Sequence, residues 1–298
     1  MKWQTAIDDY ASYLKLERGL SKNTIDSYTR DLEKLIDYLT QNEIQVTPLT
    51  ISNEQIKEFV YTISKMVSAR SQARIISGLR SFFSYLVFDN LRDTNPTDLL
   101  ESPKIGLKLP DTLSEKEINS LIDSIDLSHP QGERNRTILE TLYSCGLRVS
   151  EVITLRMSDL FFEEGFIRVI GKGNKERFIP IHKRAQKLIK LYIETNRRYI
   201  EAQKGFEDTL FLNRRGKGLT RQMIFIILKN VAESIGLHKK ISPHTFRHSF
   251  ATHLLKNGAD LRAIQQMLGH ESITTTEVYV HLDRTYLKDV LETYHPRR

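Results

Sequence analysis

Apolar residues recur at helical spacing through most of this 298-residue chain, and this pattern limits the fold more than any other feature. From Ser21, the stretch SKNTIDSYTRDLEKLIDYL places apolar side chains on one face of a helix, with Ser21 positioned as the N-cap. The same spacing recurs in residues 7–14, 56–63 and 75–87, and no alternating strand pattern interrupts it. Residues 1–102 are therefore predicted to form a small helical bundle.

A change in composition divides the chain into two domains. Residues 103–112 contain two prolines, a glycine and few core-forming side chains, which is typical of a linker. Ser114 then opens a new helix, with Glu117 at capping-box spacing. We predict an N-terminal domain at residues 1–102, a linker at 103–112 and a second domain at 113–298, in keeping with the length of the chain.

The second domain is predicted to be mostly helical, with one β-hairpin. The segment FIRVIGKGNKERFIPI has β-branched and aromatic flanks around a turn that contains Gly171, Lys172, Gly173 and Asn174. The predicted fold is therefore mainly α with two domains, an N-terminal helical bundle and an α+β domain that carries a small hairpin or sheet.

Composition excludes several classes of protein. Apolar residues make up 40% of the chain and charged residues 27%, as in ordinary globular proteins. The sequence has no run of about 18 apolar residues and no apolar leader, so we expect a cytoplasmic protein that does not insert in a membrane. The single cysteine, Cys145, cannot form an intramolecular disulfide and is expected to be a small core residue.

Positive charge is concentrated in the second domain. Residues 1–109 contain 14 basic and 14 acidic side chains, whereas residues 110–298 contain 30 and 23, so the net charge of +7 lies entirely in the second part. Within the neutral first part, residues 59–88 contain no acidic side chain. The four basic side chains of this stretch are a candidate phosphate-facing patch, and a solvated face is the alternative. They are Lys65, Arg70, Arg74 and Arg80.

The stretch ISPHTFRHSFATHLLKNG predicts a helix whose N-terminus could bind an anion. Ser242 is a predicted N-cap, and three apolar residues at intervals of four should face the core. His244 and Arg247 lie on another face near the helix N-terminus, where backbone N–H groups favour negative charge.

A zinc site is the alternative interpretation of the same helix. His244 and His248 are four residues apart, as in the H-E-x-x-H motif, but Thr245 stands where that motif has its glutamate base. No third ligand is evident, so we expect no metal.

Two further segments carry candidate polar residues. Arg148 follows Gly146 and immediately precedes a predicted helix that begins with Ser150 and Glu151. A helix at residues 260–268 ends at Gly269, which leaves His270 in the following turn.

Tyr279 follows nine residues after His270. Its segment, ITTTEVYV, is rich in β-branched residues that form helices poorly, so we hypothesise that Tyr279 moves between two positions.

These motifs together resemble the tyrosine recombinase (integrase) family, and within it the Xer-type recombinases. The matching segments are GLRVSE, GKGNKERFIPI, HTFRHSFATHLL, LGHESITTTEVY and the N-terminal LERGLSKNTIDSYTRDL, and the resemblance covers essentially the whole chain. It implies a SAM-like core-binding domain followed by a DNA breaking-rejoining catalytic domain.

The resemblance also implies residue roles. Arg148 and Arg247 would clamp the scissile phosphate, with Glu151 orienting them. Tyr279 would attack the phosphate to give a 3′-phosphotyrosyl intermediate, without metal or ATP as cofactor. Tyr286 is a nearby competitor, but it lies sixteen residues after His270.

Proton transfer is assigned to three more residues. Lys172 would be the general acid that protonates the departing 5′ oxygen, with Lys175 as the weaker alternative. His270 would donate a hydrogen bond to a non-bridging oxygen, and His244 would assist near the nucleophile. Which histidine acts as general base stays open.

The implied partner is a double-stranded DNA recombination site. The first domain would contact it through the region of Lys65 to Arg80 and through Lys22. The chain itself, or a related recombinase, would complete a tetramer on DNA, with a C-terminal exchange helix at about residues 284–298. A septum-associated DNA translocase is a further candidate partner.

The implied role is resolution of chromosome dimers during segregation. The alternatives are a mobile-element integrase, a type IB topoisomerase and a non-catalytic DNA-binding or architectural protein.

Overall fold

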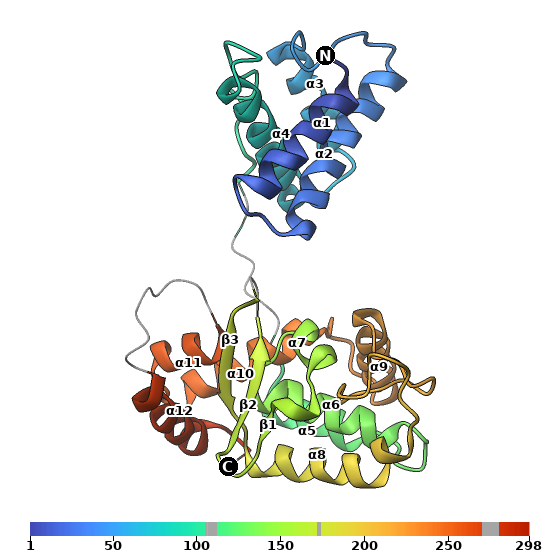
Figure 1. The fold of residues 1–298 in the computed structure, drawn as a ribbon, viewed down its shortest axis with the longest axis vertical. Helices are drawn as coiled ribbons and strands as arrows, with labels where there is room; N and C mark the ends of the chain where they lie inside the picture. The colour runs from blue at the N-terminus through green and yellow to red at the C-terminus, as the bar shows by residue number, and fades with distance from the viewer. Residues whose placement is uncertain (105, 107–111, 172–173, 270–279, 298) are drawn as a thin grey trace. The chain divides into compact units, whose positions relative to one another are not determined.

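The helices predicted for the first hundred residues are all present in the computed structural model (Figure 1). They are α1 (Trp3–Leu16), α2 (Lys22–Gln41), α3 (Asn53–Ser64) and α4 (Ala69–Phe88). Three of them begin at a serine whose side chain accepts a hydrogen bond from the backbone N–H three residues on, including the predicted cap Ser21. The prediction of an N-terminal helical bundle is confirmed.

The structure describes residues 1–104, 106, 112–171, 174–269 and 280–297, with the backbone alone for 280–285. The chain divides into two compact units, residues 1–108 and 109–298. The division falls inside the segment 103–112 that the sequence suggests as a linker. Each unit has its own buried core.

The core of the first unit lies between α4 and the other helices. In that unit α4 packs against α2 and α3, and α1 packs against α2. Fully buried side chains such as Leu32, Ile75 and Phe82 fill the interior. The Tyr10 hydroxyl donates a hydrogen bond of 2.7 Å to Ser81 Oγ and so links α1 to α4.

The second unit is helical around one small antiparallel sheet, which confirms the predicted α+β domain. Its sheet has the order β1-β2-β3, and β2 and β3 form the predicted hairpin. The elements are α5 (Glu115–Asp123), α6 (Gly132–Ser144), α7 (Val149–Thr154), β1 (Leu160–Phe161), β2 (Phe166–Ile170), β3 (Glu176–Pro180), α8 (Lys183–Thr195), α9 (Arg221–Ser234), α10 (Pro243–Lys256), α11 (Leu261–Leu268) and α12 (Val280–Tyr294). Short 3₁₀ helices occupy Met157–Asp159 and Arg197–Tyr199.

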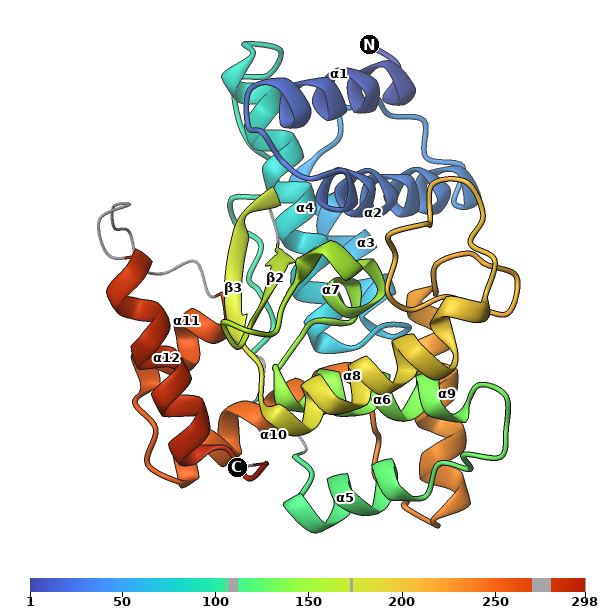
Figure 2. The same ribbon diagram turned by 60° about the horizontal axis from the view of Figure 1, so that its bottom comes forward.

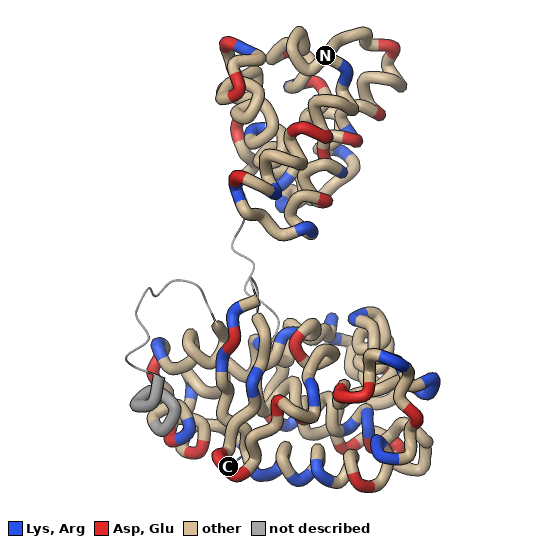
Figure 3. Tube along the Cα trace, viewed as in Figure 1, with Lys and Arg blue, Asp and Glu red and all other residues tan. Residues whose placement is uncertain are grey.

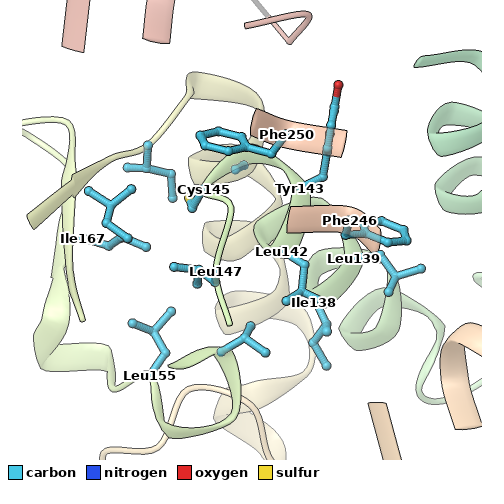
Figure 4. Close-up of a cluster of buried hydrophobic side chains, with 14 of the residues drawn as sticks. Ile138, Leu139, Leu142, Tyr143, Cys145, Leu147, Leu155, Ile167, Phe246 and Phe250 are labelled. Carbon is cyan, nitrogen blue, oxygen red and sulfur yellow. The ribbon is translucent and has the colours of Figure 1, made fainter. Parts of the chain in front are cut away.

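Helix α6 contributes much of the core of the second unit. Figure 4 shows its apolar side chains beside Phe246 and Phe250 of α10, at the positions that the spacing predicts. Cys145 is fully buried in the same cluster, as expected, and burial raises the pKa of its thiol. This packing fixes the ends of α6 and α10 relative to each other.

Helix α12 packs on its own unit. It contacts β3, α10 and α11, and it lies beside α11 in both Figure 1 and Figure 2. Leu287, Val290 and Leu291 are buried in that contact. The helix begins at Val280, a few residues before the predicted start near 284. None of the helices in the described residues is long and apolar enough to cross a membrane.

Candidate active site

A left-handed turn at Gly146 places Arg148 at the start of α7. Gly146 has a φ of +57°, which glycine adopts without strain. Arg148 is the N-cap residue of α7, and its backbone N–H donates to Glu151 Oε2 at 2.8 Å. The predicted helix start therefore holds the carboxylate of Glu151 close to the arginine that precedes it.

Arg247 approaches the same region from α10. Ser242 caps this helix and Pro243 occupies its first turn, as predicted. The Arg247 side chain is almost fully buried, and its guanidinium donates to the carbonyls of Gly146, at 2.8 Å, and of Leu268. Burial, and then the charge of Arg148, lower the pKa of Arg247 to about 9, so the group stays positive at neutral pH.

Glu151 lies at the centre of three arginines. We call this group the Glu151 cluster, and its members are Glu151, Arg148, Arg177 and Arg247. Glu151 is only 2% exposed. It accepts from Arg148 Nη1 at 2.9 Å and from both terminal nitrogens of Arg177 at 2.8 and 2.9 Å, while Arg247 Nη1 lies 3.9 Å away. Burial acts to raise the pKa of Glu151, but the hydrogen bonds and charge of Arg177 and the hydrogen bonds from Arg148 together hold it below its usual value.

The same three arginines bind the C-terminal end of α11. Arg177 Nε donates to the carbonyl of Met267 at 3.1 Å, Arg247 donates to Leu268, and Arg148 Nη2 donates to Gly269 at 3.2 Å. The last carbonyls of a helix lack intrahelical partners and carry partial negative charge, so guanidinium groups stabilise them. The end of α11, from which the chain continues to residue 270, is thereby fixed to the Glu151 cluster.

The Glu151 cluster carries an excess of positive charge. Three guanidinium groups and one carboxylate leave a net charge of +2. Each guanidinium has five N–H donors, so Arg148, whose side chain is 29% exposed, retains donors beyond those it uses within the protein. Such an arrangement suits an anion with paired acceptor oxygens, such as a phosphodiester.

Of the other predicted catalytic residues, the structure describes only His244. His244 is exposed on the first turn of α10, while Arg247 on the same helix is buried. Lys172, His270 and Tyr279 lie outside the described residues. The roles assigned to all of these residues therefore stay predictions.

The competing residues have other surroundings. Lys175 is exposed, and the Tyr286 hydroxyl on α12 donates to Asp260 Oδ2 at 3.4 Å. His248, the second residue of the alternative zinc pair, is exposed. The buried His253 forms a hydrogen bond of 2.8 Å with the Tyr143 hydroxyl through Nδ1.

The predicted DNA-facing residues of the first unit differ in their partners. Arg74 forms a two-pronged ion pair with the fully buried Asp31, and Arg80 donates to the carbonyl of Leu100 at 2.8 Å. Lys65 lies over the ring of Tyr61. Lys22 and Arg70 are exposed, and neither forms an ion pair among the described residues. Basic and acidic residues are distributed over both units (Figure 3).

Arg177 is the member of the Glu151 cluster that sequence reasoning missed. One signal was available, because residues two apart in a strand face the same side and Ile179 is an obvious core residue. An arginine on the inward face of a strand requires an internal partner. Glu151 and Met267 supply it.

The fold and the cluster together define a class of protein. A helical unit precedes a mainly helical unit in which arginines from the start of α7, from β3 and from α10 surround a buried carboxylate and leave a net positive charge.

The chain belongs to the phage integrase family. The family model "Phage integrase family" matches residues 111–285, and "Phage integrase, N-terminal SAM-like domain" matches residues 7–89. "Tyrosine recombinase XerD" of Listeria innocua is 44% identical over 292 residues, which cover 98% of each chain. The chain is accordingly a site-specific tyrosine recombinase of the Xer type.

Solved structures share the fold. XerH site-specific recombinase, bound to a palindromic difH substrate, aligns with a TM-score of 0.71 and 24% identity over 95% of this chain and 83% of that one. A lambda integrase tetramer bound to a Holliday junction aligns with a TM-score of 0.72 and 19% identity, over 93% and 80% of the two chains. At this level of identity the two structures support the architecture only.

Proposed function

We propose that this recombinase cleaves and rejoins a specific DNA duplex through Tyr279, with the Glu151 cluster as its phosphate-binding centre. The observation that carries the proposal is the net charge of +2 on that cluster, held in place by the end of α11. A scissile phosphodiester carries one negative charge, and it gains a second as the pentavalent transition state forms. Fixed guanidinium groups stabilise that developing charge.

Arg148 and Arg247 form the phosphate clamp in this proposal. Both side chains are held by a carboxylate and by backbone carbonyls, so they need little rearrangement when the substrate binds. Arg148 is the more exposed of the two and would meet the phosphate oxygens directly, whereas Arg247 would act from a more buried position. Glu151 orients both and does not react.

Proton transfer and attack fall to residues assigned from the sequence. Lys172 protonates the departing 5′ oxygen, with Lys175 as the alternative, and His270 and His244 serve the phosphate and the nucleophile. Tyr279 forms the 3′-phosphotyrosyl bond, and the released 5′ hydroxyl later reverses that step. The spacing favours Tyr279, which lies nine residues after His270, over Tyr286, which lies sixteen residues after it.

Resolution of chromosome dimers in the cytoplasm is the role we propose for this activity. The support is the identity of 44% to a XerD recombinase over almost the full length of both chains. The partners would be a double-stranded DNA site and three further protomers, either copies of this chain or a related recombinase. A septum-associated DNA translocase would activate the assembly.

The C-terminal helix would join the protomers of that assembly. Here α12 covers its own unit, and in the tetramer we propose that the segment from about residue 284 docks on a neighbour. Deleting residues 286–298 should abolish the synaptic complex in a gel-shift assay. A truncated chain that still forms this complex would show that the helix serves its own unit only.

A nicked suicide substrate tests the chemistry. The nick lets the short cleaved strand diffuse away, so the covalent protein–DNA complex accumulates and migrates as a distinct band in a denaturing gel. Wild-type protein and Tyr286→Phe should form this band on a resolution site, whereas Tyr279→Phe should form none. A covalent band with Tyr279→Phe would remove the assignment of the nucleophile, and no band with the wild type would favour a non-catalytic DNA-binding protein.

A further inference from the structure

Arg177 uses its guanidinium to join three parts of the second unit. Its two terminal nitrogens donate to the two oxygens of Glu151 on α7, at 2.8 and 2.9 Å, and its Nε donates to Met267 at the end of α11, at 3.1 Å. The side chain itself comes from β3 and is 14% exposed. One residue therefore connects the hairpin, the first turn of α7 and the last turn of α11.

Two glycines lie directly against this side chain. A Cβ atom at Gly171, in the hairpin turn, would come within 3.1 Å of Arg177 Nη1. A Cβ atom at Gly269, whose φ is +65°, would come within 3.0 Å of Arg177 Cδ. In the sequence these glycines immediately precede Lys172 and His270. Arg177 therefore packs against the backbone at both of these glycines.

We propose that Arg177 is a positioning residue for DNA cleavage. It holds the hairpin and the end of α11 on Glu151, so that the general acid, Lys172, and the phosphate clamp of Arg148 and Arg247 act on the same phosphodiester. This inference rests on the proposed function. Arg177 acts through Glu151, Gly171 and Gly269 and does not itself contact the reacting atoms.

The planar guanidinium is essential to this role. It presents two parallel donors to the carboxylate and a third donor, at a fixed angle, to the carbonyl of Met267. A lysine at this position keeps the charge but has a single nitrogen, so it cannot hold Glu151 with two bonds and α11 with another. Arg177→Lys should therefore retain the ion pair and lose part of the positioning.

A substrate with a sulfur leaving group distinguishes a misplaced general acid from an impaired fold or impaired DNA binding. When the bridging 5′ oxygen at the cleavage site is replaced by sulfur, the departing thiolate is stable without protonation, and a misplaced general acid costs little. A variant that cleaves slowly only because Lys172 is misplaced should recover on this substrate. A variant that is slow because the fold or DNA binding is impaired should not recover.

The experiment measures single-turnover cleavage by the full chain on a site that the wild type cleaves, with either oxygen or sulfur in the bridging position. Arg177→Gln should cleave the oxygen substrate about 100-fold more slowly than wild type, since small misplacements of catalytic groups have effects of this size. On the sulfur substrate the part of that loss that comes from a misplaced acid should disappear, whereas the part that comes from the lower charge of the Glu151 cluster should remain. Affinity for uncleaved DNA should stay close to the wild-type value.

Arg168→Gln is the matched control. Arg168 lies on β2 of the same hairpin and pairs with Asp159 and Glu176 instead of Glu151. Its removal should change the cleavage rate by about twofold or less, because neither of its partners belongs to the Glu151 cluster. If Arg177→Gln proves unfolded by circular dichroism, Arg177→Lys replaces it, with an intermediate loss on oxygen and the same recovery on sulfur.

The outcomes are distinct. Equal losses on oxygen and sulfur, a loss explained by weaker DNA binding, or a rate no lower than that of Arg168→Gln would each overturn the positioning role while leaving the proposed function intact. If the wild type forms no Tyr279-dependent covalent complex, the proposed function and this inference both fail.

Discussion

At the scale of single residues, Gly146 links the packing of α10 to the Glu151 cluster. Its carbonyl accepts a hydrogen bond from Arg247, and its φ of +57° lies in the left-handed region. A Cβ atom at this position would lie 2.5 Å from a ring carbon of Phe250, which is fully buried. A side chain here would therefore meet both backbone strain and a ring that cannot move aside.

Gly146→Ala and Gly236→Ala separate these two effects. Gly236 has a φ of +66° but open space around its Cα, so its alanine variant should lose only about 1 kcal/mol of unfolding free energy from strain. Gly146→Ala should lose a further 1 to 3 kcal/mol, roughly, through overpacking. Urea denaturation followed by far-ultraviolet circular dichroism measures both. Equal losses would mean that Phe250 yields to the added methyl group.

The sequence predicted part of the candidate site and missed part of it for a physical reason. Arg148 and Arg247 were identifiable because each lies beside a helix start that local capping and turn signals reveal. Arg177 belongs to a strand 26 residues after Glu151, and only the folded sheet brings the two together. Its charge alone did not distinguish it from 43 other basic residues of the chain.

At the scale of elements, the tail that follows α12 is held inside the second unit. His295 is fully buried, with ring centroids 4.9 Å from Tyr143 and 5.4 Å from Phe250. Arg297 Nε lies 3.0 Å from a carboxylate oxygen of the buried Glu140. Burial, followed by the charge of nearby His182, lowers the pKa of His295 to about 3.

This tail should loosen in acid. His295 has a pKa of about 3 when docked and about 6.5 when released, so the released tail binds more protons at intermediate pH. Docking is therefore fully stable above pH 6.5, roughly, and weakens as the pH falls toward 3. Hydrogen exchange of residues 287–297, corrected for intrinsic rates, should increase between pH 7 and pH 5.

Two histidine variants test the origin of this pH dependence. His295→Gln stays neutral at every pH and should remove most of the increase in exchange. His238→Gln changes an exposed histidine elsewhere in the unit and should leave the increase unchanged. An increase of wild-type size in His295→Gln would assign the effect to other histidines near the tail, such as the partly buried His182 and the buried His253.

Most helices could be predicted from local signals, whereas elements that depend on tertiary pairing could not. The caps at Ser21, Ser114 and Ser242 are where the sequence indicates them, because a side chain two or three atoms long satisfies the first backbone donors. Strand β1 has only two residues and forms by pairing with β2, so no periodicity could reveal it.

At the scale of the whole molecule, the two units differ in how they can attract DNA. Residues 1–109 are electrically neutral, with 14 basic and 14 acidic side chains, so any attraction there must come from a local surface. The stretch from residue 59 to 88 is the candidate, but its arginines are not equivalent. Arg70 is exposed near the start of α4, whereas Arg74, one turn further on, is bound to Asp31 and Ser27.

Arg70→Gln should therefore affect DNA binding, whereas Arg74→Gln should affect stability. Arg70→Gln should weaken duplex binding and reduce the slope of log affinity against log salt by about 1, with stability unchanged, because one phosphate contact is lost. Arg74→Gln should leave the slope unchanged but lower the unfolding free energy by about 2 kcal/mol, because the fully buried Asp31 loses its two-pronged partner and keeps only Lys34. Fluorescence anisotropy with a labelled duplex at several salt concentrations gives the slope, and urea denaturation gives the stability. A reduced slope in Arg74→Gln without loss of stability would show that Arg74 leaves Asp31 to bind phosphate.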